Sequence, residues 1–148
     1  MSDQPFAIES DPTPHELQYL EDQINQHNIN ETGFADYQPL AVFVRDAENR
    51  PIAGISGYTW GGCCEILFLW VHPDYQKMGY GRKLLQTAET EAIKRACQLV
   101  VLSSYSFQAP DFYQKLGYTI NGVYEGCPPG HRLYHLQKRL NGKSEPPA

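Results

Sequence analysis

The sequence lacks any long hydrophobic run. The longest, residues 66–71, is far too short to cross a membrane. The first four residues, Met-Ser-Asp-Gln, have neither the basic nor the apolar stretch of a secretory signal. We therefore expect no membrane association and no secretion, and the predicted location is the cytoplasm.

Cysteine is scarce and has no informative spacing. The chain has four, at positions 63, 64, 97 and 127, with no C-x-x-C pair and no spacing typical of a metal site. The sequence therefore predicts neither a disulfide framework nor a bound metal. Reduced, partly buried thiols of this kind are typical of cytoplasmic proteins.

Positive charge is also in short supply. Twelve lysines and arginines face 17 acidic residues, a net charge of −5. This balance argues against a nucleic-acid-binding protein and is compatible with a cationic amine as a substrate. With 148 residues the chain is long enough for one well-filled core. We expect a single domain over residues 1–140, followed by a disordered tail at 141–148.

Turn residues and hydrophobic periodicity divide the chain into elements. Residues 5–9 suggest a short strand, and Thr13-Pro14-His15-Glu16 is typical of a helix start, with Thr13 as the N-cap. The polar segment 25–37 contains Gly33 and is interpreted as a loop or a frayed second helix. Further strands are predicted at 40–45, 52–60, 63–71, 99–102, 118–124 and 132–140, and helices at 79–96 and 109–116.

One stretch of this pattern is typical of a phosphate-binding loop. An apolar strand ends at Val71, and Gln76, Gly79 and Gly81 follow just before an amphipathic helix. The glycines let the backbone approach an anion, and the first N–H groups of the helix point at it. The sequence has no G-x-x-x-x-G-K-[ST] loop, and Leu84 stands where a dinucleotide-binding turn needs its third glycine.

A second motif follows the buried strand at 99–102. It consists of Ala109, Phe112, Tyr113, Lys115, Gly117 and Tyr118. Together with Gln76, Gly79 and Gly81, it resembles the GNAT superfamily of N-acetyltransferases. That family commonly has Q/R-x-x-G-x-G/A at the first motif and N-x-x-A-x-x-F-Y-x-K-x-G-F/Y at the second. The resemblance covers nearly the whole chain and implies an α/β fold, the GNAT acyl-CoA N-acyltransferase fold: a central mixed sheet flanked by helices on both faces.

The resemblance also implies acetyl-CoA as co-substrate, with no metal. Two positions depart from the family pattern: Met78 stands where many members have Arg or Lys, and Ser106 where the Asn usually is. A main-chain N–H near residues 69–71 would stabilise the oxyanion. The cofactor-binding residues implied are Leu69, Trp70, Val71, Gln76, Lys77, Met78, Gly79, Tyr80, Gly81, Arg82 and Ser106.

Acetyl transfer to an amine requires a base and an acid. A protonated amine, with a pKa near ~10, must lose a proton before it attacks the thioester. The resemblance implies Tyr113 as the acid for the leaving thiolate. Glu65 lies fourteen residues before Gly79, as the catalytic glutamate does in histone-acetylating members, and alternation places it on one face with Leu67 and Leu69. His72, His131 and a chain of waters are the alternatives to Glu65.

The favoured function is an acetyl-CoA-dependent N-acetyltransferase acting on a small amine or an amino-acid-like acceptor. Transfer to a protein lysine or N-terminus is a variant of this hypothesis. The alternative from another class is a catalytically idle GNAT fold that binds CoA as a sensor or scaffold. The expected partner is a small-molecule amine or a peptide, and the sequence leaves homodimer formation open.

Overall fold

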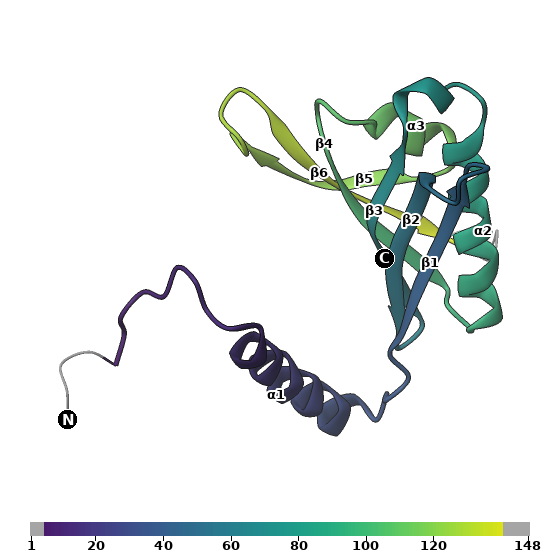
Figure 1. The fold of residues 1–148 in the computed structure, drawn as a ribbon. Helices are drawn as coiled ribbons and strands as arrows, with labels where there is room; N and C mark the ends of the chain where they lie inside the picture. The colour runs from purple at the N-terminus through teal and green to yellow at the C-terminus, as the bar shows by residue number, and fades with distance from the viewer. Residues whose placement is uncertain (1–4, 141–148) are drawn as a thin grey trace. The chain divides into compact units, whose positions relative to one another are not determined.

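The computed structural model describes residues 5–140 (Figure 1). Internal contacts divide the chain into two compact units, residues 1–35 and residues 36–148. The expected single domain over residues 1–140 stays a prediction, and the expected disordered tail at 141–148 lies outside the described residues. In chain order the elements are α1 (Pro14–Thr32), β1 (Gln38–Arg45), β2 (Pro51–Trp60), β3 (Cys63–Val71), the 3₁₀ turn η1 (Pro73–Tyr75), α2 (Tyr80–Lys94), β4 (Leu99–Tyr105), α3 (Pro110–Lys115), β5 (Thr119–Glu125) and β6 (Arg132–Arg139).

The first unit contains one helix, α1. Its N-cap is Thr13, whose side chain accepts the backbone N–H of Glu16 at 3.2 Å, as the sequence predicts. The strand predicted at 5–9 is wrong, because these residues form a turn and irregular chain. The polar segment predicted as a loop or a frayed second helix from residue 25 instead continues α1 as far as Thr32, and Gly33 ends the helix as the predicted breaker. Side-chain hydrogen bonds four residues apart, such as Gln26 to Asn30, support this polar half, and the helix ends at Gly33 with φ of 76°.

The second unit is built on a six-stranded sheet in the order β1-β2-β3-β4-β6-β5. β3 and β4 are parallel, and every other neighbouring pair is antiparallel (Figure 1). The predicted mixed sheet is therefore confirmed. β4 extends beyond the predicted 99–102 to Tyr105, because β6 continues to pair with it as far as Leu133.

The core of this unit lies between the sheet and α2. Leu85 and Ala92 of α2 are fully buried, together with Ile55 of β2 and Val100 of β4. The sequence predicts one apolar face on this helix, and four of its members are buried in the core: Leu84, Leu85, Ala88 and Ala92. The other two predicted members are wrong, because Ile93 is 48% exposed and Ala96 is exposed beyond the end of α2.

β3 carries a bulge that changes which side chains share a face. Ser56 of β2 pairs with Phe68, whereas Gly57 pairs with Ile66, so Leu67 is an extra residue on β3. A Cβ on Gly57 would lie 2.0 Å from the carbonyl oxygen of Glu65, so this close approach requires glycine.

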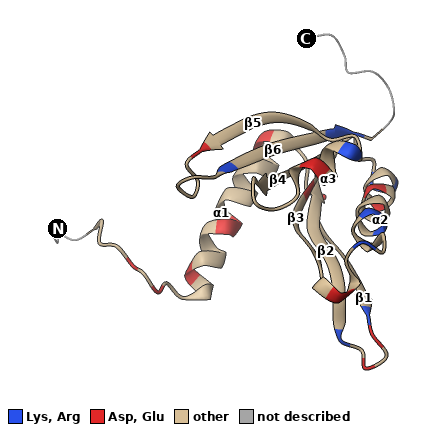
Figure 2. Ribbon diagram, turned by 90° about the horizontal axis from the view of Figure 1, so that it is seen from above, with Lys and Arg blue, Asp and Glu red and all other residues tan. Residues whose placement is uncertain are grey.

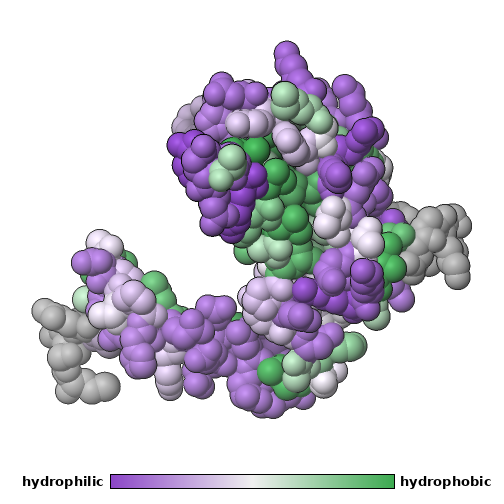
Figure 3. Space-filling view, turned by 45° about the vertical axis from the view of Figure 1, so that its right-hand side comes forward, coloured by the Kyte–Doolittle hydropathy of each residue, from purple (hydrophilic) through white to green (hydrophobic). Residues whose placement is uncertain are grey.

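The bulge corrects the predicted surroundings of Glu65. Beyond Leu67 the alternation is reversed, and Leu69 packs against the core cluster. The expectation that Glu65 shares a face with Leu69 is therefore wrong. The face of Glu65 continues instead with Phe68 and Trp70, both exposed. Hydrophobic side chains also gather in a band between hydrophilic regions in the upper part of Figure 3.

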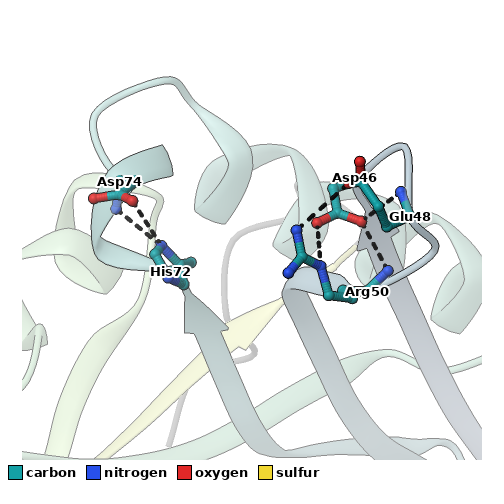
Figure 4. A network of polar contacts seen from close by, with 5 residues as sticks. All are labelled: Asp46, Glu48, Arg50, His72 and Asp74. Carbon is teal, nitrogen blue, oxygen red and sulfur yellow. Dashed lines mark hydrogen bonds and ion pairs between the residues drawn. The ribbon is translucent and has the colours of Figure 1, made fainter.

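A polar turn joins β1 and β2. One carboxylate oxygen of Asp46 accepts the backbone N–H groups of Glu48 and Arg50, each at 2.9 Å, and the other accepts Nε of Arg50 at 2.9 Å (Figure 4). The hydrogen bond from the Arg50 backbone is the largest cause that lowers the pKa of Asp46 below its usual 3.8. The turn therefore depends on an ionised Asp46.

Candidate functional site

A short loop connects β3 to α2, and two side chains fix it to the end of the strand. His72 caps η1, where its Nδ1 accepts the backbone N–H of Asp74 at 3.1 Å (Figure 4). The side-chain amide of Gln76 donates to the carbonyl of Val71 at 3.1 Å. Both residues therefore position the loop, and His72 is occupied as a cap.

The backbone of this loop has the form of an anion-binding cradle. Lys77 and Gly79 both have positive φ, 64° and 85°, and Gly79 is the N-cap of α2. No described side chain caps this helix end, so its first N–H groups remain available to an anion. Alternating backbone conformations of this kind form concavities that bind anions. α2 also carries basic side chains (blue on α2 in Figure 2), including Arg82 in its first turn.

Gly81 allows a second element to approach the loop. A Cβ at this position would lie 3.3 Å from the ring of Phe112, on α3. Phe112 is half-buried and packs against the core. The second glycine of the motif therefore lets α3 pack closely on the first turn of α2, which brings the two sequence motifs together.

The two motifs border one large cavity of about 960 Å³. It opens where β3 and β4 diverge, since their pairing ends at Ile66 and Leu102. Most of the predicted cofactor-binding residues line it: Leu69, Trp70, Val71, Gln76, Lys77, Gly79, Tyr80, Gly81 and Arg82. Met78 is exposed and is not among its lining residues.

Ser106 lies apart from this cavity. Its hydroxyl accepts the backbone N–H of Arg132 at 3.0 Å, and it lines a smaller cavity of about 380 Å³ by the β5–β6 hairpin. His131 lines the same small cavity, with its ring 5.0 Å from that of Phe107. The structure therefore separates Ser106 and His131 from the anion-binding loop.

Tyr113 lies on α3 and lines the large cavity. It is 9% exposed, and burial raises the pKa of its hydroxyl above the usual 10.0. A buried phenol in this position stays protonated at neutral pH and can donate a proton into the cavity. Its placement suits the predicted acid.

Glu65 lies on β3, half-buried, and does not line the large cavity. Its carboxylate accepts a hydrogen bond from the hydroxyl of Tyr58. This bond is the largest cause that raises the pKa of Tyr58. The ring of Tyr37 packs 5.3 Å from that of Tyr58. Glu65 is therefore held in an aromatic setting beside the cavity, and its role as the base stays a prediction.

Sequence reasoning missed one polar pair at the cavity wall. Ser103 of β4 lines the large cavity, and its hydroxyl lies 3.0 Å from Nδ1 of His135 on β6. The two residues are 32 positions apart and meet only through the pairing of these strands. The sequence signal was a histidine inside a predicted strand, which by itself names no partner.

No group of three or more His, Cys, Asp or Glu side chains among residues 5–140 is arranged to hold a metal ion. No helix in the same range is long and apolar enough to cross a membrane.

The family of this chain follows from comparison with known proteins. The family model of the acetyltransferase (GNAT) family matches residues 4–118, which is most of the chain. The protein therefore belongs to the GNAT family and is an acetyltransferase. The resemblance noted from Gln76, Gly79 and Gly81 is confirmed.

Individual relatives agree with this assignment. The acetyltransferase Atu2258 of Agrobacterium fabrum is 28% identical over 121 residues, covering 82% of this chain and 88% of the relative. The blasticidin-S acetyltransferase of Streptomyces morookaense is 29% identical over 116 residues, covering 76% and 85%. The crystal structure of an acetyltransferase from Bacillus cereus superposes with a TM-score of 0.77 at 32% identity, covering 90% of this chain and 97% of that one.

Proposed function

We propose that this protein is an acetyl-CoA-dependent N-acetyltransferase whose acceptor is the primary amine of a small molecule. The observation that carries the proposal is the large cavity that joins the anion-binding loop at Gly79 to the buried Tyr113. A pyrophosphate-bearing thioester needs an anion cradle at one end of its site and a proton donor at the other. This cavity has both.

The residues present fit acetyl-CoA. The loop amides around Lys77 and Gly79, with Arg82 nearby, would hold the pyrophosphate. The exposed edge of β3 beyond Ile66, which β4 no longer covers, offers main-chain groups along the cavity. Acetyl-CoA, when bound, supplies an acetyl group already activated as a thioester.

The chain's own groups move the protons of the reaction. A C–N bond forms and a C–S bond breaks, so the acceptor nitrogen loses protons and the leaving sulfur gains one. Burial keeps the Tyr113 hydroxyl protonated, and it donates this proton to sulfur. The second proton that the nitrogen loses as the amide forms then restores the hydroxyl. Main-chain N–H groups near Leu69–Val71 stabilise the negative charge that develops on the carbonyl oxygen.

One relative favours a small acceptor over a protein lysine. This relative, similar over most of the chain, is named for an acetyltransferase of blasticidin-S, a small molecule. The net charge of −5 favours a cationic acceptor, whether a small amine or a protein lysine, and so does not distinguish between the two. The second candidate function is a CoA-binding scaffold without activity. That function would not require the Tyr113 hydroxyl at the cavity wall.

The test combines binding with turnover. Thermal unfolding is followed with acetyl-CoA, longer acyl-CoAs and NAD as a control, and release of the CoA thiol is followed with amines. The panel contains blasticidin-S, aminoglycosides, free amino acids and lysine peptides. We expect stabilisation by acetyl-CoA but not NAD, and thiol release with at least one small amine. Stabilisation with no turnover would favour the scaffold, and turnover only with peptides would overturn the acceptor class.

A further inference from the structure

We propose that Ser103 and His135 act together as the base of the reaction, with Ser103 passing the proton of the acceptor amine to His135. This inference rests on the proposed function and names the group that the reaction still needs. Neither residue belongs to the sequence motifs of the chain, and both come together through strand pairing alone.

The position of the pair suits a base at the site of transfer. Ser103 follows Leu102, the last residue of β4 that pairs with β3, so its side chain lies where the two strands part. It lines the same cavity as Leu69 and Tyr113. His135 stands behind it on β6, with Nδ1 3.0 Å from the Ser103 hydroxyl. The imidazole therefore connects to the cavity through the serine.

The surroundings of His135 do not resemble those of a structural histidine. Its Nε2 is the buried side-chain polar atom that lacks a hydrogen-bond partner among residues 5–140. Buried polar atoms in proteins are nearly always paired, and an exception calls for an explanation. The hydrogen bond of the imidazole is to Ser103, and Ser103 lines the cavity.

The direct strand partners of His135, Ser103 on β4 and Gly122 on β5, carry no formal charge. On β4 the residues flanking Ser103 on this face are Val101 and Tyr105, and on β5 Gly122 and Tyr124 lie across from β6. On these two strands, the titratable side chains beside His135 on this face are therefore Tyr105 and Tyr124. Glu65 of β3 is the strand partner of Val101 of β4, so it lies diagonally from Ser103. By strand register it is the nearest acid on this face.

The ring of Tyr124 holds the imidazole of His135 in place. It packs perpendicular to the imidazole, with the ring centroids 4.8 Å apart. A Cβ on Gly122 would lie 3.3 Å from the imidazole, so this residue lets β5 approach the ring closely. These two contacts fix the orientation of the imidazole toward Ser103.

The proton transfer balances as follows. The acceptor enters as an ammonium ion and gives one proton to the Ser103 oxygen, while the hydroxyl proton of Ser103 passes to Nδ1 of His135. The amine is left neutral with a free electron pair, the serine is unchanged, and the imidazole becomes an imidazolium with hydrogens on both nitrogens. After transfer the proton returns through Ser103 to water. The neutral ring must therefore carry its hydrogen on Nε2.

The first test is kinetic. His135→Gln keeps a group that can hydrogen-bond Ser103 but cannot take up a proton at neutral pH. We expect kcat to fall about 100-fold, with the KM for acetyl-CoA unchanged and the acid limb of the kcat/KM profile altered. Ser103→Ala should lose a similar factor, Ser103→Thr should recover most of it, and the double variant should be no worse than either single one.

Two histidine controls separate the pair from the other candidates. His15→Gln changes an exposed histidine of α1 and should leave the profile as in the parent protein. His131→Gln changes the alternative base by the β5–β6 hairpin. If His131→Gln rather than His135→Gln removed the acid limb, the proposal would be overturned. Unchanged kinetics in both Ser103→Ala and His135→Gln would overturn it as well.

The second test does not depend on activity. Nitrogen NMR of ¹⁵N-histidine protein reports which ring nitrogen of His135 carries the hydrogen, with His135→Gln providing the assignment. We expect Nδ1 without hydrogen at neutral pH in the free protein, and a changed signal in Ser103→Ala. A hydrogen on Nδ1 would contradict the relay. These results are read on the protein alone, whereas absence of turnover in the parent protein would count against the proposed function instead.

Discussion

The hydroxyl of Tyr118 donates a hydrogen bond of 2.7 Å to Glu89 of α2, deep in the core. Lys138 of β6 lies 3.1 Å from the other carboxylate oxygen and completes the arrangement. Burial, and then the bond to Glu89, raises the pKa of Tyr118. Tyr118 closes the second sequence motif, and its role in the structure is to tie the start of β5 to the helix that carries the anion-binding loop.

Tyr118→Phe tests this structural role. The variant keeps the ring packing but removes the hydroxyl, while Lys138 still pairs with Glu89. We expect the free energy of unfolding to fall by about 1–2 kcal/mol, measured by urea denaturation. Tyr19→Phe, which removes an exposed hydroxyl from α1, is the control and should change little. An equal effect of both substitutions would refute a specific contribution from the Glu89 bond.

The sequence predicted the parts of the site whose signal is local. Gln76, Gly79 and Gly81 indicate the loop from sequence alone. Gly79 has a positive φ and Gly81 makes a close packing contact, and both features favour glycine at a fixed spacing. The second motif likewise drew attention to Tyr113, which lines the cavity, and its role as the acid stays a prediction. The succession of strands along the chain from residue 40 onward was also predicted, from hydrophobic pattern and turn residues.

The rest depends on contacts between segments far apart in the chain. The bulge at Leu67 reverses the alternation from which Glu65 and Leu69 were predicted to share a face. The residue that goes with this bulge is Gly57, and it lies on a different strand. The Ser103–His135 contact depends on strand register, which is set by tertiary packing. The strand predicted at 5–9 had suitable residues but pairs with no described strand.

Gly79→Asp should remove acetyl-CoA binding without unfolding the protein. A Cβ there would meet no atom within 4 Å, but a carboxylate would stand at the helix end that we propose as the pyrophosphate site. We expect the thermal stabilisation by acetyl-CoA to disappear.

Two variants isolate the charge in that experiment. Gly79→Ala imposes the same positive-φ strain, about 1 kcal/mol, without a charge and should retain part of the stabilisation by acetyl-CoA. Gly33→Asp introduces the same carboxylate at the C-cap glycine of α1, which has a φ of 76°, and should leave acetyl-CoA binding intact. Full acetyl-CoA binding by Gly79→Asp would mean that the loop is not the phosphate site.

Tyr113→Phe should slow transfer without weakening binding. Under the proposed function Tyr113 donates a proton to sulfur, so its loss is expected to lower kcat by about 100-fold or more, with the KM for acetyl-CoA little changed. Because burial raises the pKa of Tyr113 above the usual 10.0, the parent enzyme should keep this acid protonated beyond that pH. Steady-state thiol release across pH checks both statements. An unchanged kcat in Tyr113→Phe would assign the acid elsewhere.

Asp46 should make stability depend on pH in the acid range. Its folded-state pKa is lowered, chiefly by the backbone hydrogen bond from Arg50, so its contribution is present above the unfolded value near 3.8 and is lost as pH falls through the folded value. Asp46→Asn should therefore lower Tm at about pH 6, and the difference from the parent protein should shrink below about pH 4. Calorimetry at several pH values tests this, and a constant difference would rule out the ionised carboxylate as the cause.

Gly57→Ala addresses the bulge that shapes the cavity edge of β3. The added Cβ would lie 2.0 Å from the Glu65 carbonyl, a backbone atom that moves only if β3 moves. We expect a loss of about 3 kcal/mol in the free energy of unfolding and a reduced thermal shift with acetyl-CoA, since residues 67–70 line the cavity. Gly54→Ala on the same strand is the matched control, because its Cβ meets the exposed ring of Phe43, which can turn aside. If both variants kept their stability and their acetyl-CoA shift, the close approach at Gly57 would not be what sets the shape of β3.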